Sequence, residues 1–203
     1  MQDPVRVGLL GCGNVGAPLV RLLDGNADRI AARAGVAIDV TRVAVRDASR
    51  SRDVKLGADR FTADAASVVA DPNVDVVVEV IGGLDPARQL ITAALEAGKP
   101  VVTANKELIA QHGPELFETA ARAGVDLLFE ASVAGGIPLM RPLRESLAGD
   151  RIHRVVLGLP CVHNRRCLEQ NIGGQVAVIE HECSRGGDAQ GTQAQPGEET
   201  PAV

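Results

Sequence analysis

A Gly-x-Gly-x-x-Gly pattern at residues 11–16 constrains this chain more than any other feature of its sequence. It lies between an apolar run, Val5–Leu10, that predicts a β-strand and a segment with helical periodicity. In this context Gly11 allows a tight turn, Gly13 lets a pyrophosphate approach, and Gly16 lets the helix pack closely on the strand. The start of the helix adds unpaired N–H groups and a partial positive charge that attract an anion. The pattern therefore predicts a dinucleotide-binding turn; a tight turn that binds nothing is the alternative.

Short β-branched runs alternate with helical patterns between residue 5 and about residue 156. This alternation predicts repeated βα units and hence an α/β fold, a doubly wound, Rossmann-type sheet of six mostly parallel strands. After the first strand, the expected strands are residues 36–45, 75–81, 100–103, 125–130 and 152–156. The expected helices are about residues 15–23, 86–97 and 114–123.

The second of these helices has the most complete set of signals. Asp85 is its expected N-cap, Pro86 suits its first turn, and Gly98 ends it. Its expected apolar stripe is Ala87, Leu90, Ile91, Ala94 and Leu95. The stripe of the helix after the glycine turn is Val15, Leu19, Leu22 and Leu23. Both stripes are expected to pack on the sheet.

Composition and charge exclude several classes of protein. The chain has 203 residues, 45% hydrophobic and 23% charged, which predicts one packed domain with or without an appendage. Its formal net charge of −5 argues against a surface that binds nucleic acid. No apolar run approaches the ~20 residues that span a bilayer, and the N-terminus lacks the pattern of a signal peptide. We expect no nucleic-acid partner, no membrane partner, and a cytoplasmic location with reduced cysteines.

The pattern changes abruptly after Val156. Residues 161–167 show neither helical nor strand periodicity, and residues 184–203 are rich in Gly, Gln, Pro and Glu. The expected organisation is an NAD(P)-binding Rossmann domain at residues 1–156 and an aberrant, largely disordered tail at residues 157–203. The tail's thiols and imidazoles are ligand types for zinc, but no zinc pattern has the spacing of Cys161, His163, Cys167, His181 and Cys183.

Arg46 stands where many NAD-binding proteins have an acidic residue, directly after the second expected strand. An acidic side chain there accepts hydrogen bonds from ribose hydroxyls, whereas a guanidinium can pair with a 2′-phosphate through its planar fork. Further basic residues nearby are Arg42, Arg50, Arg52 and Lys55. We therefore expect NADP as the cofactor, with NAD as the alternative. Because Asp47 and Asp53 are interspersed, an ordinary solvated surface is the other interpretation.

Two further segments follow expected strands and so reach the carboxyl edge of the sheet, where open α/β folds bind ligands. Residues 103–106 place Lys106 where it can meet a cofactor phosphate or polarise a substrate oxygen; a surface lysine that starts a helix is the alternative. Residues 130–138 combine Glu130 with a glycine-rich turn that exposes backbone carbonyls. Oxygen ligands of this kind suit a hard cation, although an ordinary turn is the default interpretation.

Taken together, four segments resemble the bacterial homoserine dehydrogenase family. They are residues 11–16, 43–47, 98–106 and 130–138, and the resemblance continues through residues 141–150. It covers the chain from its start to about Val156 and corresponds to the family's nucleotide-binding domain. The resemblance implies an NAD(P)-dependent oxidoreductase that interconverts L-aspartate 4-semialdehyde and L-homoserine, on the route to threonine, methionine and isoleucine. Hydride then passes between the nicotinamide and the carbonyl carbon.

The resemblance also implies roles for individual residues. Cofactor contacts fall to Gly11, Cys12, Gly13, Asn14, Val15, Gly16, Arg46 and Lys106, with Arg46 at the adenosine phosphate. Lys106 is in addition a candidate catalytic residue near the reaction centre. A structural sodium ion is implied at Glu130, Val133, Gly135 and Ile137. Homo-oligomers are a further expectation. If the domain that follows in the family is missing, the apolar surface that it would cover is exposed, and such surface promotes association.

The chain departs from the family pattern after Val156. The family continues with a substrate domain that carries an acidic substrate ligand and a proton-donating lysine, whereas this chain has no lysine after Lys106. We expect a frameshifted or truncated reading frame, which reading the gene's other frames downstream would test. Loss of a general acid typically costs about 10²- to 10⁴-fold in rate, so this chain is expected to be a poor catalyst or inactive.

Two other functions stay open. The first is a non-catalytic NADP-binding module or remnant, which turnover of homoserine would exclude. The second is another dehydrogenase that acts on an amino acid or a sugar. The presence of the Lys106 and Glu130 motifs counts against the second.

Overall fold

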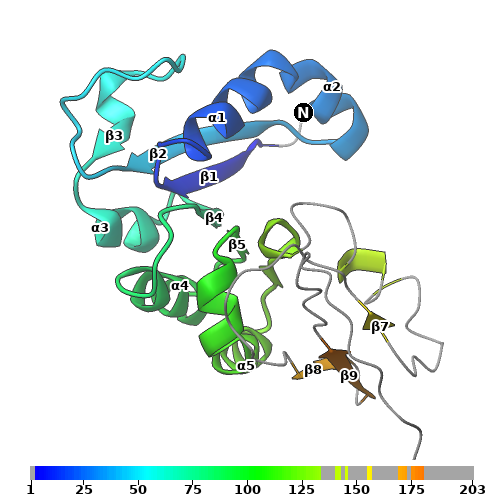
Figure 1. The fold of residues 1–203 in the computed structure, drawn as a ribbon. Helices are drawn as coiled ribbons and strands as arrows, with labels where there is room; N and C mark the ends of the chain where they lie inside the picture. Colours follow the sequence, from blue (N-terminus) through cyan, green and yellow to red (C-terminus); the bar gives the residue numbers. More distant parts are fainter. Residues whose placement is uncertain are drawn as a thin grey trace, which may run out of the picture.

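A computed structural model of the chain describes residues 3–133, 140–142, 145, 155–156, 169–172 and 175–180. Six parallel strands form one sheet with the order β3-β2-β1-β4-β5-β6 (Figure 1). The strands are β1 (Val5–Leu10), β2 (Ile38–Ala44), β3 (Phe61–Thr62), β4 (Val76–Glu79), β5 (Val101–Thr103) and β6 (Leu127–Leu128). The direction of strand addition reverses between β1 and β4, as in a doubly wound sheet. The expected Rossmann-type fold is confirmed.

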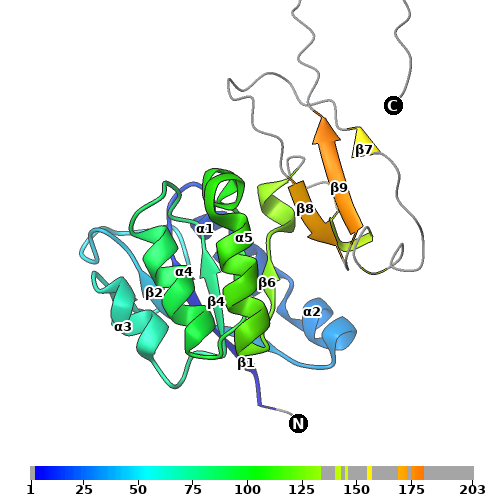
Figure 2. The same cartoon turned by 90° about the horizontal axis from the view of Figure 1, so that it is seen from below.

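Helices cover both faces of this sheet. They are α1 (Gly16–Gly25), α2 (Ala27–Ala34), α3 (Ala65–Ala70), α4 (Ala87–Glu96) and α5 (Lys106–Ala123). Helices α1 and α2 lie on one side of the sheet and α3, α4 and α5 on the other, and Figure 2 shows α4 and α5 side by side (Figures 1 and 2). None of the described helices combines the length and apolar character needed to cross a bilayer.

Each face of the sheet has its own buried apolar cluster, because side chains alternate along a strand. In β1, Val7 and Leu9 belong to the cluster on the α1 face, whereas Leu10 belongs to the cluster under α3, α4 and α5. Gly8 also faces α3: a Cβ there would lie 2.8 Å from Val68 Cγ1. The close fit of α3 on β1 therefore depends on the absence of a side chain at Gly8.

Helix α4 confirms its predicted stripe, since all five expected residues are buried: Ala87, Leu90, Ile91, Ala94 and Leu95. Gly98 follows the helix with φ of 74°, as predicted for a residue that ends it. The predicted cap is wrong. Pro86 occupies the N-cap position, the Asp85 side chain makes no capping hydrogen bond there, and Asp85 is exposed. The helix thus relies on burial of its stripe rather than on a side-chain cap.

The predicted stripe of α1 is only partly right. Leu19 and Leu23 pack against the core, but Val15 is 55% exposed and Leu22 is 56% exposed. The fully buried positions are Gly16 and Val20, one turn apart. The apolar pattern missed this face because its first member is a glycine, which carries no hydrophobic side chain.

Helix α5 begins at Lys106, eight residues before the start expected at Pro114. Asn105 caps it, since its side-chain oxygen accepts a hydrogen bond from the Leu108 amide at 3.1 Å. Pro114 therefore lies inside the helix, where it supplies no N–H to the preceding turn. Complete burial of Leu108 and Leu116 on either side of the proline compensates for that loss.

The sixth strand of the sheet is not the one expected at residues 152–156. β3, which the sequence pattern did not indicate, pairs with β2 at the opposite edge. β7 (Val155–Val156) instead pairs in parallel with β9 (Gln175–Glu180), which pairs antiparallel with β8 (Glu169–Ile172). β8 and β9 lie within the stretch predicted as an irregular tail, and its other residues lie outside the described ones.

Arg6 and Asp75 join β1 to the start of β4 at the amino edge of the sheet. The guanidinium donates from Nε to Asp75 Oδ2 at 2.9 Å and from Nη2 to Oδ1 at 2.6 Å. The Arg6 backbone amide adds a hydrogen bond to Oδ2 at 2.8 Å. These bonds lower the pKa of Asp75 from 3.8 to about 2.

We expect Asp75→Asn to lower the melting temperature at pH 7, because a neutral amide cannot form the paired, charge-assisted bonds. A carboxyl group with a lowered pKa stabilises the fold above its unfolded pKa and loses that effect as the pH falls through its folded value. The difference in melting temperature should therefore shrink between about pH 4 and pH 2. Asp126→Asn, at an exposed position, is the control. A difference in melting temperature between the wild-type chain and Asp75→Asn that stays constant down to pH 2 contradicts the prediction.

Candidate functional site

Four adjacent strands end in register at the carboxyl edge of the sheet. Leu10 pairs with Ala44 of β2 on one side and with Glu79 of β4 on the other. Glu79 pairs in turn with Thr103 of β5. The segments that follow these strands therefore emerge at one edge. They carry three of the predicted site features, namely residues 11–16, Arg46 and Lys106, and Glu130 follows the neighbouring strand β6.

The three glycines of the turn differ in what surrounds them. Gly11 has φ of 101°, a conformation that favours glycine, and a Cβ there would lie 2.9 Å from Ile81 Cγ2. A Cβ on Gly16 would overlap the carbonyl oxygen of Gly11. A Cβ on Gly13 would meet no atom of the described residues within 4 Å. The fold itself thus requires Gly11 and Gly16, whereas Gly13 faces open space in which a ligand can lie.

The start of α1 is suited to an anion. Among the described residues, no side chain caps its first turn. The Ala17 amide donates to the Gly13 carbonyl oxygen at 3.0 Å and Pro18 has no N–H, but no hydrogen bond within the described residues engages the amides of Val15 and Gly16, which can meet a ligand. Cys12 is buried in the same turn, and burial raises the pKa of its thiol. A neutral thiol is a poor nucleophile. Cys12 therefore packs in the cluster on the α1 face rather than serving as a reactive group.

Arg46 is exposed on the loop that follows β2, and this loop is internally bonded. The Arg52 guanidinium donates to the carbonyl oxygens of Asp47 at 2.8 Å and Arg50 at 2.7 Å. The Ser49 hydroxyl and amide donate to the Asp47 carboxylate and lower its pKa. Within the described part of the chain, no hydrogen bond or ion pair engages the Arg46 guanidinium. Its donors are thus available to an anionic ligand.

Lys106 is exposed at the first position of α5. The positive end of a helix stabilises anions and disfavours cations, by about 0.3–1 kcal/mol at an exposed position. The charge of Lys106 therefore does not serve the stability of α5. Its position next to the strand ends favours an anionic group or a polarised oxygen as its partner.

Of the four residues predicted to bind sodium, the structure describes Glu130 and Val133; Gly135 and Ile137 lie outside the described residues. The Glu130 carboxylate is half-buried and accepts hydrogen bonds from the backbone amides of Met140 and Arg141, both at 3.0 Å. Each carboxylate oxygen keeps a further lone pair that a cation can use. The donor chemistry at Glu130 thus fits a cation.

Sequence reasoning missed a buried polar network centred on Glu79, whose side chain has no exposed surface. Glu79 Oε1 accepts hydrogen bonds from the amides of Ile81 at 2.8 Å and Gly82 at 3.0 Å. Glu79 Oε2 accepts one from the Thr103 hydroxyl at 2.6 Å. The signal was a single acidic residue inside an otherwise apolar strand run, because a buried carboxylate needs several donors.

The same network reaches the start of α5. The Thr103 hydroxyl accepts a hydrogen bond from the Asn105 amide at 3.0 Å. The Asn105 side chain donates to the carbonyl oxygen of Gly83 at 2.6 Å and accepts from Leu108. Ser132, after β6, donates to the Thr103 carbonyl oxygen at 2.9 Å. The ends of β4, β5 and β6 are therefore joined by side-chain hydrogen bonds.

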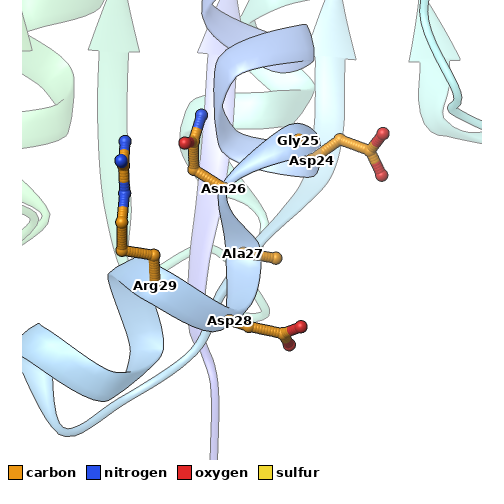
Figure 3. Close-up of a pocket in the computed structure, with 6 residues that line it drawn as sticks. All are labelled: Asp24, Gly25, Asn26, Ala27, Asp28 and Arg29. Carbon is orange, nitrogen blue, oxygen red and sulfur yellow. The ribbon is translucent and has the colours of Figure 1, made fainter.

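A surface hollow lies at the other end of α1, where it meets α2. It is lined by Asp24, Gly25, Asn26, Ala27, Asp28 and Arg29. Figure 3 shows the carboxyl groups of Asp24 and Asp28 on one side of the turn and Arg29 on the other. Asp24 is paired with Lys55 at 2.9 Å. None of the predicted site residues borders this hollow, so we place the candidate site at the strand ends instead.

Comparisons with known proteins identify the family. A family model described as the NAD binding domain of homoserine dehydrogenase matches residues 11–130. The homoserine dehydrogenase of Bacillus subtilis is 43% identical over 152 residues, which are 75% of this chain and 35% of that protein. The chain thus spans about a third of that relative's length.

Solved structures give the same result. A crystal structure of a homoserine dehydrogenase from Thiobacillus denitrificans is 47% identical, with a TM-score of 0.69 over 74% of this chain and 35% of that one. A hyperthermophilic archaeal homoserine dehydrogenase in complex with NADPH shares the fold at 24% identity, with a TM-score of 0.59 over 72% of this chain and 50% of that one. Since the family model covers more than half of the sequence, this chain belongs to the homoserine dehydrogenase family, whose nicotinamide-cofactor-binding domain it contains.

Proposed function

We propose that this chain binds NADP(H) at the carboxyl edge of its sheet and takes part in the interconversion of L-aspartate 4-semialdehyde and L-homoserine. The observation that carries the proposal is the register of the strand ends, which places the glycine turn, Arg46 and Lys106 at one edge. The strand order reverses at this edge between β1 and β4, where doubly wound sheets bind dinucleotides. Family membership supports the substrates.

Different segments of the chain bind different parts of the proposed cofactor. The turn at residues 11–16 and the start of α1 hold the pyrophosphate through backbone N–H groups, with Gly13 leaving room for it. Arg46 pairs with the 2′-phosphate at the end of β2, which favours NADP over NAD. Lys106 donates a hydrogen bond to an anionic or carbonyl oxygen on the far side of the reversal. When bound, the nicotinamide supplies or accepts the hydride.

Fluorescence of NADPH tests binding directly. The chain has no Trp and no Tyr, so the emission of added NADPH is recorded without an aromatic background from the protein. We expect a saturable change in emission as the 203-residue chain is titrated. Homoserine-dependent reduction of NADP and NAD, followed in the near-ultraviolet, then tests turnover, with the Bacillus subtilis relative as the positive control.

A non-catalytic NADP-binding module is the second candidate. The observation that favours it is that only 152 residues, 75% of this chain, match the Bacillus subtilis relative, so part of the given sequence departs from the family pattern. NADPH binding with no turnover supports this candidate. Turnover near that of the control excludes it, and failure to bind NADPH at all contradicts both candidates.

Sodium is proposed as a structural ion at Glu130 and Val133, together with Gly135 and Ile137. The support is the donor chemistry of the Glu130 carboxylate, which is held near the strand ends by two backbone amides. We expect a higher melting temperature in sodium chloride than in choline chloride at equal ionic strength, because an ion that binds only the folded state stabilises it. Glu130→Gln should reduce this difference. Equal melting temperatures in both salts would count against the site.

A further inference from the structure

Glu79 is an acidic residue at the end of β4, one of the two central strands of the sheet, with no exposed surface. Replacing buried ionic groups by apolar ones of similar size is often neutral or stabilising, so burial of a carboxylate is weak evidence for a stabilising role. Its three hydrogen bonds all come from other residues at the strand ends: Ile81, Gly82 and Thr103. These hydrogen bonds therefore fix the positions of the two backbone amides and of the threonine hydroxyl.

The segment that Glu79 holds is intrinsically flexible. Gly82 and Gly83 are consecutive glycines with φ of 74° and 73°, and glycine has the largest conformational freedom of any residue. Glu79 fixes the amide of Gly82, and the Asn105 side chain fixes the carbonyl oxygen of Gly83 at 2.6 Å. The Gly82 amide is therefore held at the end of β4, and the Gly83 carbonyl oxygen by the residue that caps α5, directly before Lys106.

The strand order indicates which part of a bound dinucleotide meets this segment. In the proposed binding mode the adenosine end would lie at the end of β2, near Arg46 on the loop that follows it, and the pyrophosphate at the turn after β1. A dinucleotide that crosses the reversal between β1 and β4 extends next over the ends of β4 and β5. The nicotinamide half would then lie over residues 81–83 and Lys106. Ile81 is 40% exposed there and offers an apolar surface to a ring.

We propose that Glu79 is a positioning residue that, through Thr103, holds residues 81–83 and Lys106 in one arrangement that grips the nicotinamide half of the cofactor. This inference rests on the proposed function, because it requires NADP(H) to bind at this edge. It assigns to Glu79 and Thr103 a role in the affinity for the nicotinamide half alone. The adenosine half, held at β1 and β2, does not depend on them.

Two ligands separate these halves: NADPH and adenosine 2′,5′-bisphosphate, which lacks the nicotinamide. Glu79→Gln keeps one acceptor for the Ile81 and Gly82 amides, but its NH2 group cannot accept the hydrogen bond that the Thr103 hydroxyl donates to Oε2. We expect the Kd for NADPH to rise about tenfold or more, as for loss of a strong hydrogen bond. The Kd for the bisphosphate should stay within about twofold of the wild-type value.

Thr103→Val and Thr103→Ser provide a second test if Glu79→Gln does not fold. The valine removes the hydroxyl and should reproduce the selective loss of NADPH affinity, whereas the serine keeps the hydroxyl and should restore it. Thr119→Val is the matched control, because Thr119 is a buried threonine of α5 whose hydroxyl, among the described residues, bonds only within that helix. This substitution also removes a threonine hydroxyl, but at a position away from the strand ends. It should leave the affinities for NADPH and for the bisphosphate unchanged.

The outcomes are distinct. Selective loss of NADPH affinity in Glu79→Gln and Thr103→Val, with normal bisphosphate affinity, supports the inference. Equal loss for both ligands, or no loss for either, overturns it while leaving the proposed function intact. A wild-type chain that binds neither ligand overturns the proposed function, and the inference falls with it.

Discussion

Gly16→Ala is expected to lower the free energy of unfolding by about 3 kcal/mol, the upper end of the range for overpacking, and to abolish detectable NADPH binding. The added Cβ would overlap the carbonyl oxygen of Gly11 and lie 3.3 Å from Val80 Cγ2. Two of its three nearest atoms belong to the backbone of the turn, so no side chain can rotate away to make room. The start of α1 must therefore move off the sheet, and with it the N–H groups proposed to hold the pyrophosphate.

Chemical denaturation and NADPH titration measure the two effects. Gly25→Ala is the control in the same helix, because a Cβ there would have no atom of the described residues within 4 Å. It should leave binding unchanged and raise stability by up to about 1 kcal/mol, as alanine does in place of a helical glycine. Gly13→Ala, which also has open space, should keep wild-type stability but weaken NADPH binding. Wild-type stability and binding in Gly16→Ala would refute the packing argument.

Arg46→Ala is expected to weaken NADPH binding about 10- to 100-fold, as for loss of one to two charge-assisted hydrogen bonds. NADH binding should change by less than about twofold, because NADH has no 2′-phosphate. Arg46 is exposed, and the loop that carries it is held by Arg52 and Ser49, so the substitution should leave the loop in place. Isothermal titration with both cofactors measures the ratio of the two dissociation constants.

Arg33→Ala, at an exposed position of α2, is the control for the loss of one positive charge. It should change the affinities for NADPH and NADH equally and only slightly. The affinity of the wild-type chain for NADPH should also fall with added salt more steeply than its affinity for NADH, because an exposed ion pair is screened. Equal losses for both cofactors in Arg46→Ala would show that Arg46 does not read the 2′-phosphate. The arginines after β2 would then form an ordinary solvated surface.

Prediction of the fold from the sequence succeeded where side-chain patterns were long and regular. The strand ending at Leu10, the stripe of α4 and the positive φ of Gly98 all follow from local periodicity and conformational preference. It failed for β3 and for the first eight residues of α5. A two-residue strand carries no period, and the helix continues through Pro114 because tertiary burial outweighs the local cost of the proline.

The positions of Arg46 and Lys106 at the carboxyl edge of the sheet could be predicted from the sequence, whereas their roles in binding stay predictions. Arg46 and Lys106 each follow a strand closely, and parallel strands bring their carboxyl ends to one edge. Glu79 was missed because its partners, Thr103 and the amides after β4, are set by the pairing of β4 with β5. The pairing register cannot be obtained from the composition of either strand alone.

The sequence by itself determined that this chain forms a doubly wound α/β domain with a glycine-rich turn after its first strand, because alternation of short-range periods and the placement of glycines are local properties. Only the tertiary structure decided which strand completes the sheet, which face of α1 is buried, and how Glu79 is satisfied. Each of these depends on contacts between segments far apart in the chain, such as β2 with β3 and Glu79 with Thr103. Such contacts are selected by packing and by the need of buried polar groups for partners, which no local pattern encodes.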